Sequence, residues 1–312
     1  SMRSIISLLL ILILSSCNNE LDLKNNFSPN IKVINESSTS SNKINSWINY
    51  ASLKMSNQNA NILSVSWNVG DFVNEGGFDR PFNTNEVIIS EDKIENILSE
   101  ISNWLDETCL NSNQKKRELK NYRNYLEKGA DASTQIDLCP NYRLLLMAFT
   151  PHMEEDEYTG EQGFVIHELY HAFQHDLSNE SCRRKRDKSD SNGTWLVEGA
   201  ASYFSSIVVG EMNNYNGVNN LLKLVYNAYR EDNSKSIYGS DMANRSAAGI
   251  RLMIERGWLN ESEILDGSFF HNCKSEQEWS KDNPNASKIK NLWYLIEEKD
   301  GKYVFTEEAL EG

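Results

Sequence analysis

The segment GFVIHELYHAFQH, residues 163–175, decides how the chain is interpreted, because it places three histidines at four-residue intervals in an apolar helical pattern. On an α-helix, residues four apart lie on one face and about 6 Å apart along the axis, so His167 and His171 can bind one metal ion. His175 is about 12 Å from His167 by the same rise, beyond the reach of a shared site. We therefore expect two histidine ligands, with His175 capping the helix, supporting a ligand or exposed.

Glu168 directly follows the first histidine, so its carboxylate flanks the metal without needing to coordinate it. That is the position of a general base for an attacking water. A catalytic zinc site usually has three protein ligands and one open position, so the chain must supply one more ligand. Metzincin-like sites take their third ligand from a histidine six residues after the second, but that position is Leu177 here. TWLVEGAASYF (194–204) offers Glu198 on a second expected helix, followed by three small residues that allow two helices to approach closely.

The two segments HELYH (167–171) and WLVEGAASY (195–203) together resemble the gluzincin metallopeptidases, the thermolysin-like group in which HExxH on one helix is completed by a glutamate on the next. The resemblance is clear over residues 162–209. It implies a zinc cofactor and an activating role for Glu168 toward a water held by the zinc. The zinc ligands that it implies are His167, His171 and Glu198.

The resemblance also implies a zincin-like fold, with a helical catalytic core beside a mixed sheet and the segment 142–149 as the strand that borders the cleft. The thermolysin-like form has an aspartate four residues after the glutamate, whereas this chain has Ser202, so the partners of the histidine ligands stay open. Related enzymes add a tyrosine or histidine donor to the oxyanion. Tyr238 is the candidate here, against the alternative of a tyrosine packed at a helix start. His152 and His271 are weaker candidates.

Periodicity over the rest of the chain predicts an α+β fold, with a small mixed sheet followed by a mainly helical C-terminal part. Runs of β-branched and other apolar residues predict strands at 61–67, 85–90 and 142–149. Helical spacing predicts helices over 90–107, 113–128, 218–231 and 242–258. Near the C-terminus, Asp300-Gly301 between apolar-rich arms fits a small hairpin, with a helix as the alternative.

The N-terminus indicates export. Arg3 precedes an apolar run, 5–14, that is too short to span a bilayer, and LSSC follows at 14–17. This pattern resembles a bacterial lipobox and predicts a signal peptide over 1–16 and lipidation of Cys17, at the outer membrane or cell surface. A plain signal peptide is the alternative. The segment 17–42 is rich in Asn and Ser and predicts a flexible tether.

We expect one metallopeptidase domain over 43–312, in which a sheet-containing part, the active-site helices and a helical part follow one another as 43–162, 163–210 and 211–312. Four cysteines other than Cys17 remain in an exported chain, where oxidation is allowed. The pairings Cys109–Cys139 and Cys182–Cys273 are favoured because each cysteine then stays near its neighbours in sequence. Free buried thiols are the alternative.

Composition narrows the function classes. The 312 residues carry a formal charge of −14, which argues against duplex nucleic acid and anionic lipid surfaces as partners. The leading interpretation is a zinc-dependent peptidase, acting on a peptide or protein and joined to the membrane through its lipid anchor only. A zinc-dependent amidase acting on a cell-wall or glycan component and a non-catalytic binding lipoprotein are the alternatives. The oligomeric state stays open.

Overall fold

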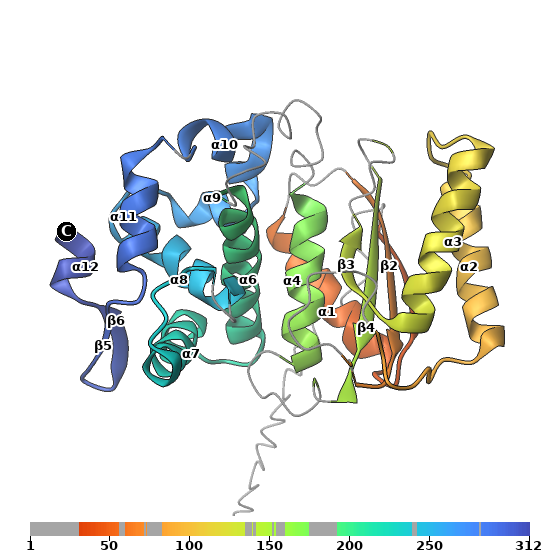
Figure 1. Ribbon diagram of the computed structural model, residues 1–312, viewed down its shortest axis with the longest axis horizontal. Coiled ribbons are helices and arrows are strands. Elements are labelled where there is room, and N and C mark those ends of the chain that lie inside the picture. Colours follow the sequence, from red (N-terminus) through yellow and green to blue (C-terminus); the bar gives the residue numbers. More distant parts are fainter. Residues whose placement is uncertain are drawn as a thin grey trace, which may run out of the picture.

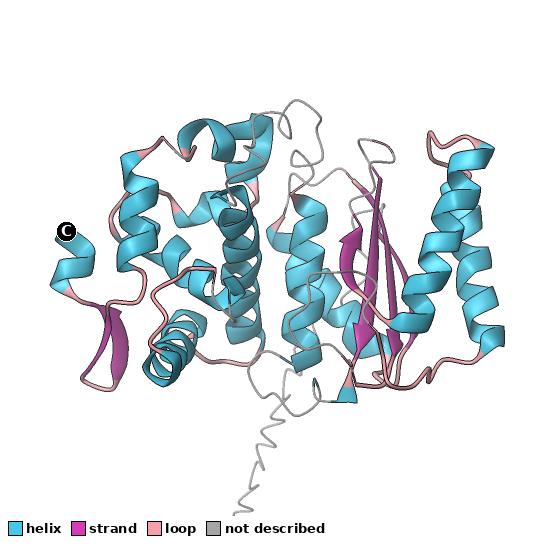
Figure 2. Ribbon diagram, viewed as in Figure 1, coloured by secondary structure: helices cyan, strands magenta, loops and turns pink. Residues whose placement is uncertain are grey.

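The computed structural model describes residues 31–55, 60–71, 73, 83–134, 139, 142–151, 153, 160–174, 192–238, 242–280 and 282–312. Within them the chain is α+β, with a mixed four-stranded sheet enclosed by helices and a mainly helical C-terminal part (Figure 1; Figure 2). The predicted fold class is therefore confirmed. In the same residues, no helix combines the length and the apolar character needed to cross a membrane.

The sheet-containing part comprises, in chain order, β1 (Ile31–Glu36), α1 (Ser41–Lys54), β2 (Asn61–Asn68), α2 (Glu91–Leu105), α3 (Ser112–Lys128), β3 (Asp131–Thr134) and β4 (Tyr142–Phe149). Two long helices follow, α4 (Gly160–Phe173) and α6 (Asn192–Met212). The C-terminal part comprises α7 (Gly217–Asp232), α8 (Met242–Glu255), α9 (Glu261–Leu265), η3 (Ser268–Cys273), α10 (Lys274–Glu278), α11 (Pro284–Leu292), β5 (Ile296–Lys299), β6 (Lys302–Phe305) and α12 (Glu307–Glu311).

The sheet has the strand order β1-β2-β4-β3, in which β1, β2 and β4 are parallel and β3 pairs antiparallel with β4. Both faces of β4 are covered, which explains its continuous apolar sequence. Leu144 and Leu146 pack with α2 and α3 on one face, whereas Leu145 and Met147 pack with α1 and α4 on the other. Figure 1 shows these two helical layers on either side of the sheet. The sheet therefore fixes the position of α4.

The predicted strands at 61–67 and 142–149 and the predicted helices at 90–107 and 113–128 are confirmed as β2, β4, α2 and α3. α2 buries one apolar face and begins after Ser90, although the Ser90 side chain makes no capping hydrogen bond. α3 ends at Gly129, whose φ of 88° lies in the region that favours glycine. Amphipathic spacing was thus sufficient to locate the two helices, and runs of apolar residues were sufficient to locate the two strands.

The prediction of a flexible tether over 17–42 is wrong for residues 31–42, because β1 occupies residues 31–36 and α1 begins at Ser41. β1 pairs in parallel with β2, from Ile31 opposite Ile62 to Glu36 opposite Trp67. The β-branched residues Ile31, Val33 and Ile34 favour a strand here, and the partner strand lies some thirty residues away in sequence. The folded domain therefore begins before residue 43.

The predicted strand at 85–90 is also wrong. Its backbone bonds back to the chain that leaves β2, because the N–H of Gly70 donates to Glu86 O at 3.2 Å and the N–H of Asn85 donates to Asp71 O at 2.9 Å. Val87 and Ile88 are more than half exposed. The apolar residues of this segment therefore do not join the sheet, and only Ile89 is buried.

The C-terminal part packs on α6. A Cβ added at Gly199 of α6 would lie 2.7 Å from the carbonyl carbon and oxygen of Ser246, so α6 and α8 are in close backbone contact. The predicted helices at 218–231 and 242–258 are confirmed as α7 and α8, and the predicted hairpin is confirmed as β5 and β6, with Asp300 and Gly301 at its turn. These helices back the face of α6 that is turned away from α4.

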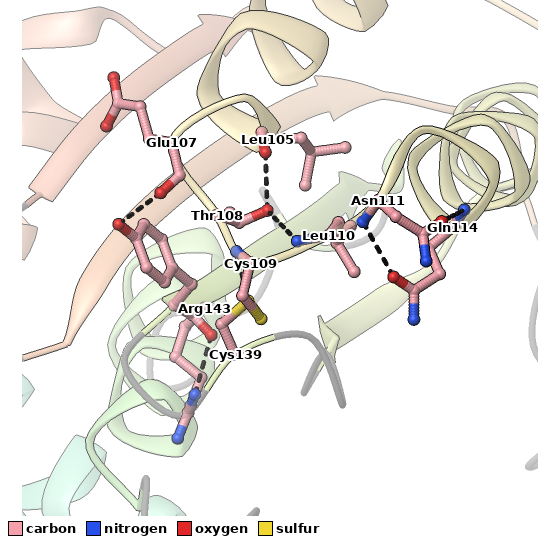
Figure 3. Close-up of a disulfide and its surroundings, with 10 residues drawn as sticks. Leu105, Glu107, Thr108, Cys109, Leu110, Asn111, Gln114, Cys139 and Arg143 are labelled. Atoms are coloured by element: carbon pink, nitrogen blue, oxygen red, sulfur yellow. Dashed lines mark hydrogen bonds between the residues drawn. A yellow bond between two sulfur atoms is a disulfide. The ribbon is translucent and has the colours of Figure 1, made fainter.

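A disulfide joins Cys109 and Cys139, as predicted, and ties the loop between α2 and α3 to the chain that enters β4 (Figure 3). Thr108 and Tyr142 make further bonds beside it, to the carbonyl oxygens of Leu105 and Glu107. Cys273 is also disulfide-bonded. Its predicted partner, Cys182, lies outside the described residues, so that pairing stays a prediction.

Candidate metal centre

Two antiparallel helices, α4 and α6, build the centre, and they lie side by side in Figure 1. Hydrogen bonds join them at both ends of the contact. Ser205 Oγ donates to Gly163 O at 2.8 Å near the start of α4, and Gln174 Nε2 donates to Val197 O at 3.1 Å just after its end. As the chain advances along α4, its partners on α6 therefore move toward the N-terminus of α6. This register places Glu198 opposite the two histidines.

The side chains of His167, His171 and Glu198 converge on one point, and their ligand atoms all lie within 4.8 Å of one another. The Nε2 atoms of His167 and His171 are 3.0 Å apart. Glu198 Oε2 is 3.3 Å from His167 Nε2 and 3.5 Å from His171 Nε2. The three predicted ligands are thus brought together, and as a set of two imidazoles and one carboxylate they could hold a metal ion.

The centre is partly open to solvent. The side chains of His167 and His171 are 16% and 12% exposed, and that of Glu198 is 28% exposed, so the three side chains are not sealed from solvent. Glu168 is buried, with 5% of its surface exposed, and its negative charge acts on His171. Glu168 is thus close enough to His171 for its charge to act on that ring, and it is not one of the three grouped residues.

The metal-free centre is strongly coupled electrostatically. Burial lowers the pKa of His171, but the charge and the hydrogen bond of Glu198, the charge of Glu168 and the hydrogen bond of Gln174 outweigh it and raise that pKa to about 9. Burial raises the pKa of Glu198, but the charges and hydrogen bonds of the two histidines outweigh this and hold it well below its usual range. Without a metal, a proton on His171 therefore compensates the negative charge of Glu198.

Each histidine also has a partner at its second ring nitrogen. His167 Nδ1 lies 3.0 Å from Ser202 Oγ, and His171 Nδ1 lies 2.8 Å from Gln174 Oε1. Ser202 stands at the position that the sequence left unassigned. Gln174 was missed, although it follows His171 by three residues and therefore lies on the same helical face. A polar residue at that spacing in an otherwise apolar segment was the signal for it.

The other predicted site residues lie elsewhere or outside the described part of the chain. Among the described residues, the hydroxyl of Tyr238 has no hydrogen-bond partner, and Lys290 Nζ lies 5.5 Å from the centroid of its ring. No contact in that part of the chain joins Tyr238 to the three ligands, so its role at an oxyanion stays a prediction. His271 lies in η3 and is not one of the grouped ligands. The residues that lie outside the described part are Cys17, His152 and His175.

Comparison of the chain with known proteins found no relative. No family model, no curated protein and no solved structure matches it.

Proposed function

We propose that the chain is a zinc-dependent peptidase in which His167, His171 and Glu198 hold the metal and Glu168 is the general base. One observation carries the proposal, namely the separations of 3.0, 3.3 and 3.5 Å among the three ligand atoms. A tetrahedral ion with bonds of about 2.0–2.2 Å has ligand atoms about 3.3–3.5 Å apart. The side chains are therefore arranged at close to the edge length that tetrahedral zinc requires.

Among the described residues the group has three protein ligands, which corresponds to a catalytic rather than a structural zinc site, because structural sites use four. Zinc, when bound, supplies a lowered water pKa and a polarised carbonyl. Glu168 takes the proton from the attacking water and delivers it to the leaving amine, for which its position beside the ligands is suited. The partial exposure of Glu198 leaves a side from which a substrate carbonyl can approach.

A peptide is favoured over other amides by an edge strand that contacts α4. β3 is at the edge of the sheet, pairs only with β4 among the described residues, and contacts α4. An unpaired edge strand can bind an extended peptide through backbone hydrogen bonds. Such a peptide, paired along β3, would run beside the helix that carries both histidines. The N-terminal lipidation pattern remains the basis for proposing that the enzyme acts at the bacterial envelope.

The test is the variant Glu168→Gln, assayed with a fluorogenic peptide library after zinc loading. This change removes the base and leaves all three ligands, so we expect unchanged zinc content and turnover lowered by about 100- to 10,000-fold. Glu211→Gln is the matched control, because Glu211 lies at the far end of α6 and, within the described part of the chain, bonds Lys54 and Tyr50 of α1. It should keep both zinc and turnover. Full turnover by Glu168→Gln, or no cleavage by the zinc-loaded wild type, would overturn the proposal.

A further inference from the structure

The hydrogen bonds at Gln174 fix the chemical form of His171. Gln174 is 2% exposed, and its amide bridges His171 Nδ1 and the carbonyl oxygen of Val197. A carbonyl oxygen only accepts, so the amide nitrogen must face Val197 and the amide oxygen must face His171. His171 therefore carries its proton on Nδ1. Its Nε2 is the atom with the free lone pair for a metal once the ring is neutral.

The same bridge fixes the distance between the two halves of the centre. Gln174 directly follows α4, and Val197 is the neighbour of Glu198 on α6. The amide thus connects the ring of one ligand to the backbone beside another. Any movement of α6 away from α4 at this point breaks a buried hydrogen bond, which keeps Glu198 within reach of His171.

Ser202 supports the other histidine from one turn further along the helix that carries Glu198. Its Oγ lies 3.0 Å from His167 Nδ1, and the residue is 7% exposed. When the hydroxyl accepts from Nδ1–H, Nε2 of His167 is left to bind the metal, as at His171. Both supporting groups are uncharged, whereas a carboxylate behind a histidine raises its basicity as a ligand.

We propose that Gln174 and Ser202 are the positioning residues of the metal centre, and that this chain supports both histidine ligands through neutral hydrogen-bond acceptors tied to α6. The inference rests on the proposed function and adds to it two residues that do not touch the metal. It also assigns their effect, which is to fix the tautomer of each ring and the spacing between the two helices.

The test measures zinc affinity by competition with a chelator for the wild type, Gln174→Met and Ser202→Ala. Gln174→Met keeps the size and loses both hydrogen bonds, and Ser202→Ala loses only the hydroxyl. Loss of such a partner typically weakens metal binding by about 10- to 100-fold, which is the effect expected for each variant. Ser205→Ala is the matched control, because Ser205 also joins α6 to α4 but bonds the backbone of Gly163 instead of a ring. Its affinity should stay within about threefold of the wild type, below the range for a lost ring partner.

Two further readouts separate positioning from a general structural role. Ser202→Thr keeps the hydroxyl and should restore the affinity that Ser202→Ala loses. Nitrogen-15 NMR of the zinc-loaded wild type should show both ligand histidines protonated on Nδ1 and metal-bound through Nε2. The two Ser202 variants act on His167, and Gln174→Met acts on His171. If the variants at one position do not fold, the zinc affinity of those at the other position still tests the positioning role.

The outcomes distinguish this inference from the proposed function. A wild-type chain that binds no zinc would overturn the proposed function itself. A wild type that binds zinc, together with Gln174→Met and Ser202→Ala variants that bind it equally tightly, would overturn the positioning role and leave the ligand set standing. Metal bound through Nδ1 of either histidine would also contradict the inference.

Discussion

Zinc affinity should depend steeply on pH, because zinc and a proton compete for His171. In the metal-free centre, Glu198 and Glu168 raise the pKa of His171 to about 9, so the ring is protonated at neutral pH. A metal ligand must be the neutral ring, so binding releases that proton. The zinc affinity is therefore lost as the pH falls below about 9, and it levels off above that value.

The size of the effect follows from one proton. Each pH unit below the pKa changes the affinity tenfold, which corresponds to about 1.4 kcal/mol. Between pH 6.5 and pH 8.5 the zinc affinity should therefore rise about 80-fold, or by roughly 2.6 kcal/mol, since the dependence begins to level off near the pKa. A histidine of ordinary pKa would show almost no change over that interval, because it is already neutral over most of it. A rise in zinc affinity on the alkaline side of pH 7.5 therefore distinguishes a raised pKa of His171 from an ordinary one.

Calorimetric titration with zinc in two buffers of different ionisation enthalpy counts the protons released. We expect about one proton from His171 at pH 7.5, where the raised pKa keeps this ring protonated. Glu198→Gln removes the charge that raises the pKa of His171, so this variant should bind zinc more weakly and lose the pH dependence above about pH 7.5. A wild type that releases no proton at pH 7.5, with flat affinity up to pH 9, would refute the coupling between His171 and Glu198.

Three further predictions concern packing, the disulfide and the support of the metal. Gly199→Ala should destabilise the protein by about 1–3 kcal/mol in a denaturant titration, because the new Cβ would lie 2.7 Å from backbone atoms of Ser246; unchanged stability would show that α6 and α8 can move apart freely. Replacing Cys109 and Cys139 by alanine should cost about 4 kcal/mol of unfolding free energy, since the bond closes a loop with a sequence separation of 30, and a variant as stable as the oxidised wild type would contradict this. Ser202→Asp replaces the neutral hydroxyl behind His167 by a charged acceptor and should tighten zinc binding about tenfold in the chelator assay. Weaker zinc binding by the folded variant would contradict the role of Ser202 as a hydrogen-bond acceptor for His167.

Sequence periodicity was sufficient for elements whose residues bury one face locally. α2 and α3 follow from apolar spacing, and β4 follows from its unbroken apolar run between two helical layers. Two segments were misjudged because distant partners decide them. Residues 31–36 were assigned to the Asn- and Ser-rich tether, although they include Ile31, Val33 and Ile34, and they form a strand by pairing with β2. Residues 85–90 look like a strand but find no place in the sheet. Strand pairing across tens of residues is not encoded in local composition.

The part of the site that lies on one helix could be predicted from helical geometry. The four-residue spacing of the histidines and the position of Glu168 follow from a single helix, and the structure brings the two histidines together as that spacing requires. The register between α4 and α6 depends on contacts between the helices, which no spacing rule provides. Glu198 could therefore be predicted only from a second motif, on α6. The same limit applies to Gln174, whose partner Val197 lies on the other helix, and to the neighbours of Tyr238.

The most direct test of the ligand set is the zinc content and zinc affinity of the wild type beside Glu198→Ala, measured at equal free zinc. The account predicts one zinc per wild-type chain, bound through two imidazole nitrogens and a carboxylate oxygen in X-ray absorption. It predicts that Glu198→Ala binds at least about 100-fold more weakly, because one of three protein ligands is lost. Equal affinity in the two proteins, or a wild-type zinc without a carboxylate ligand, would contradict the central claim.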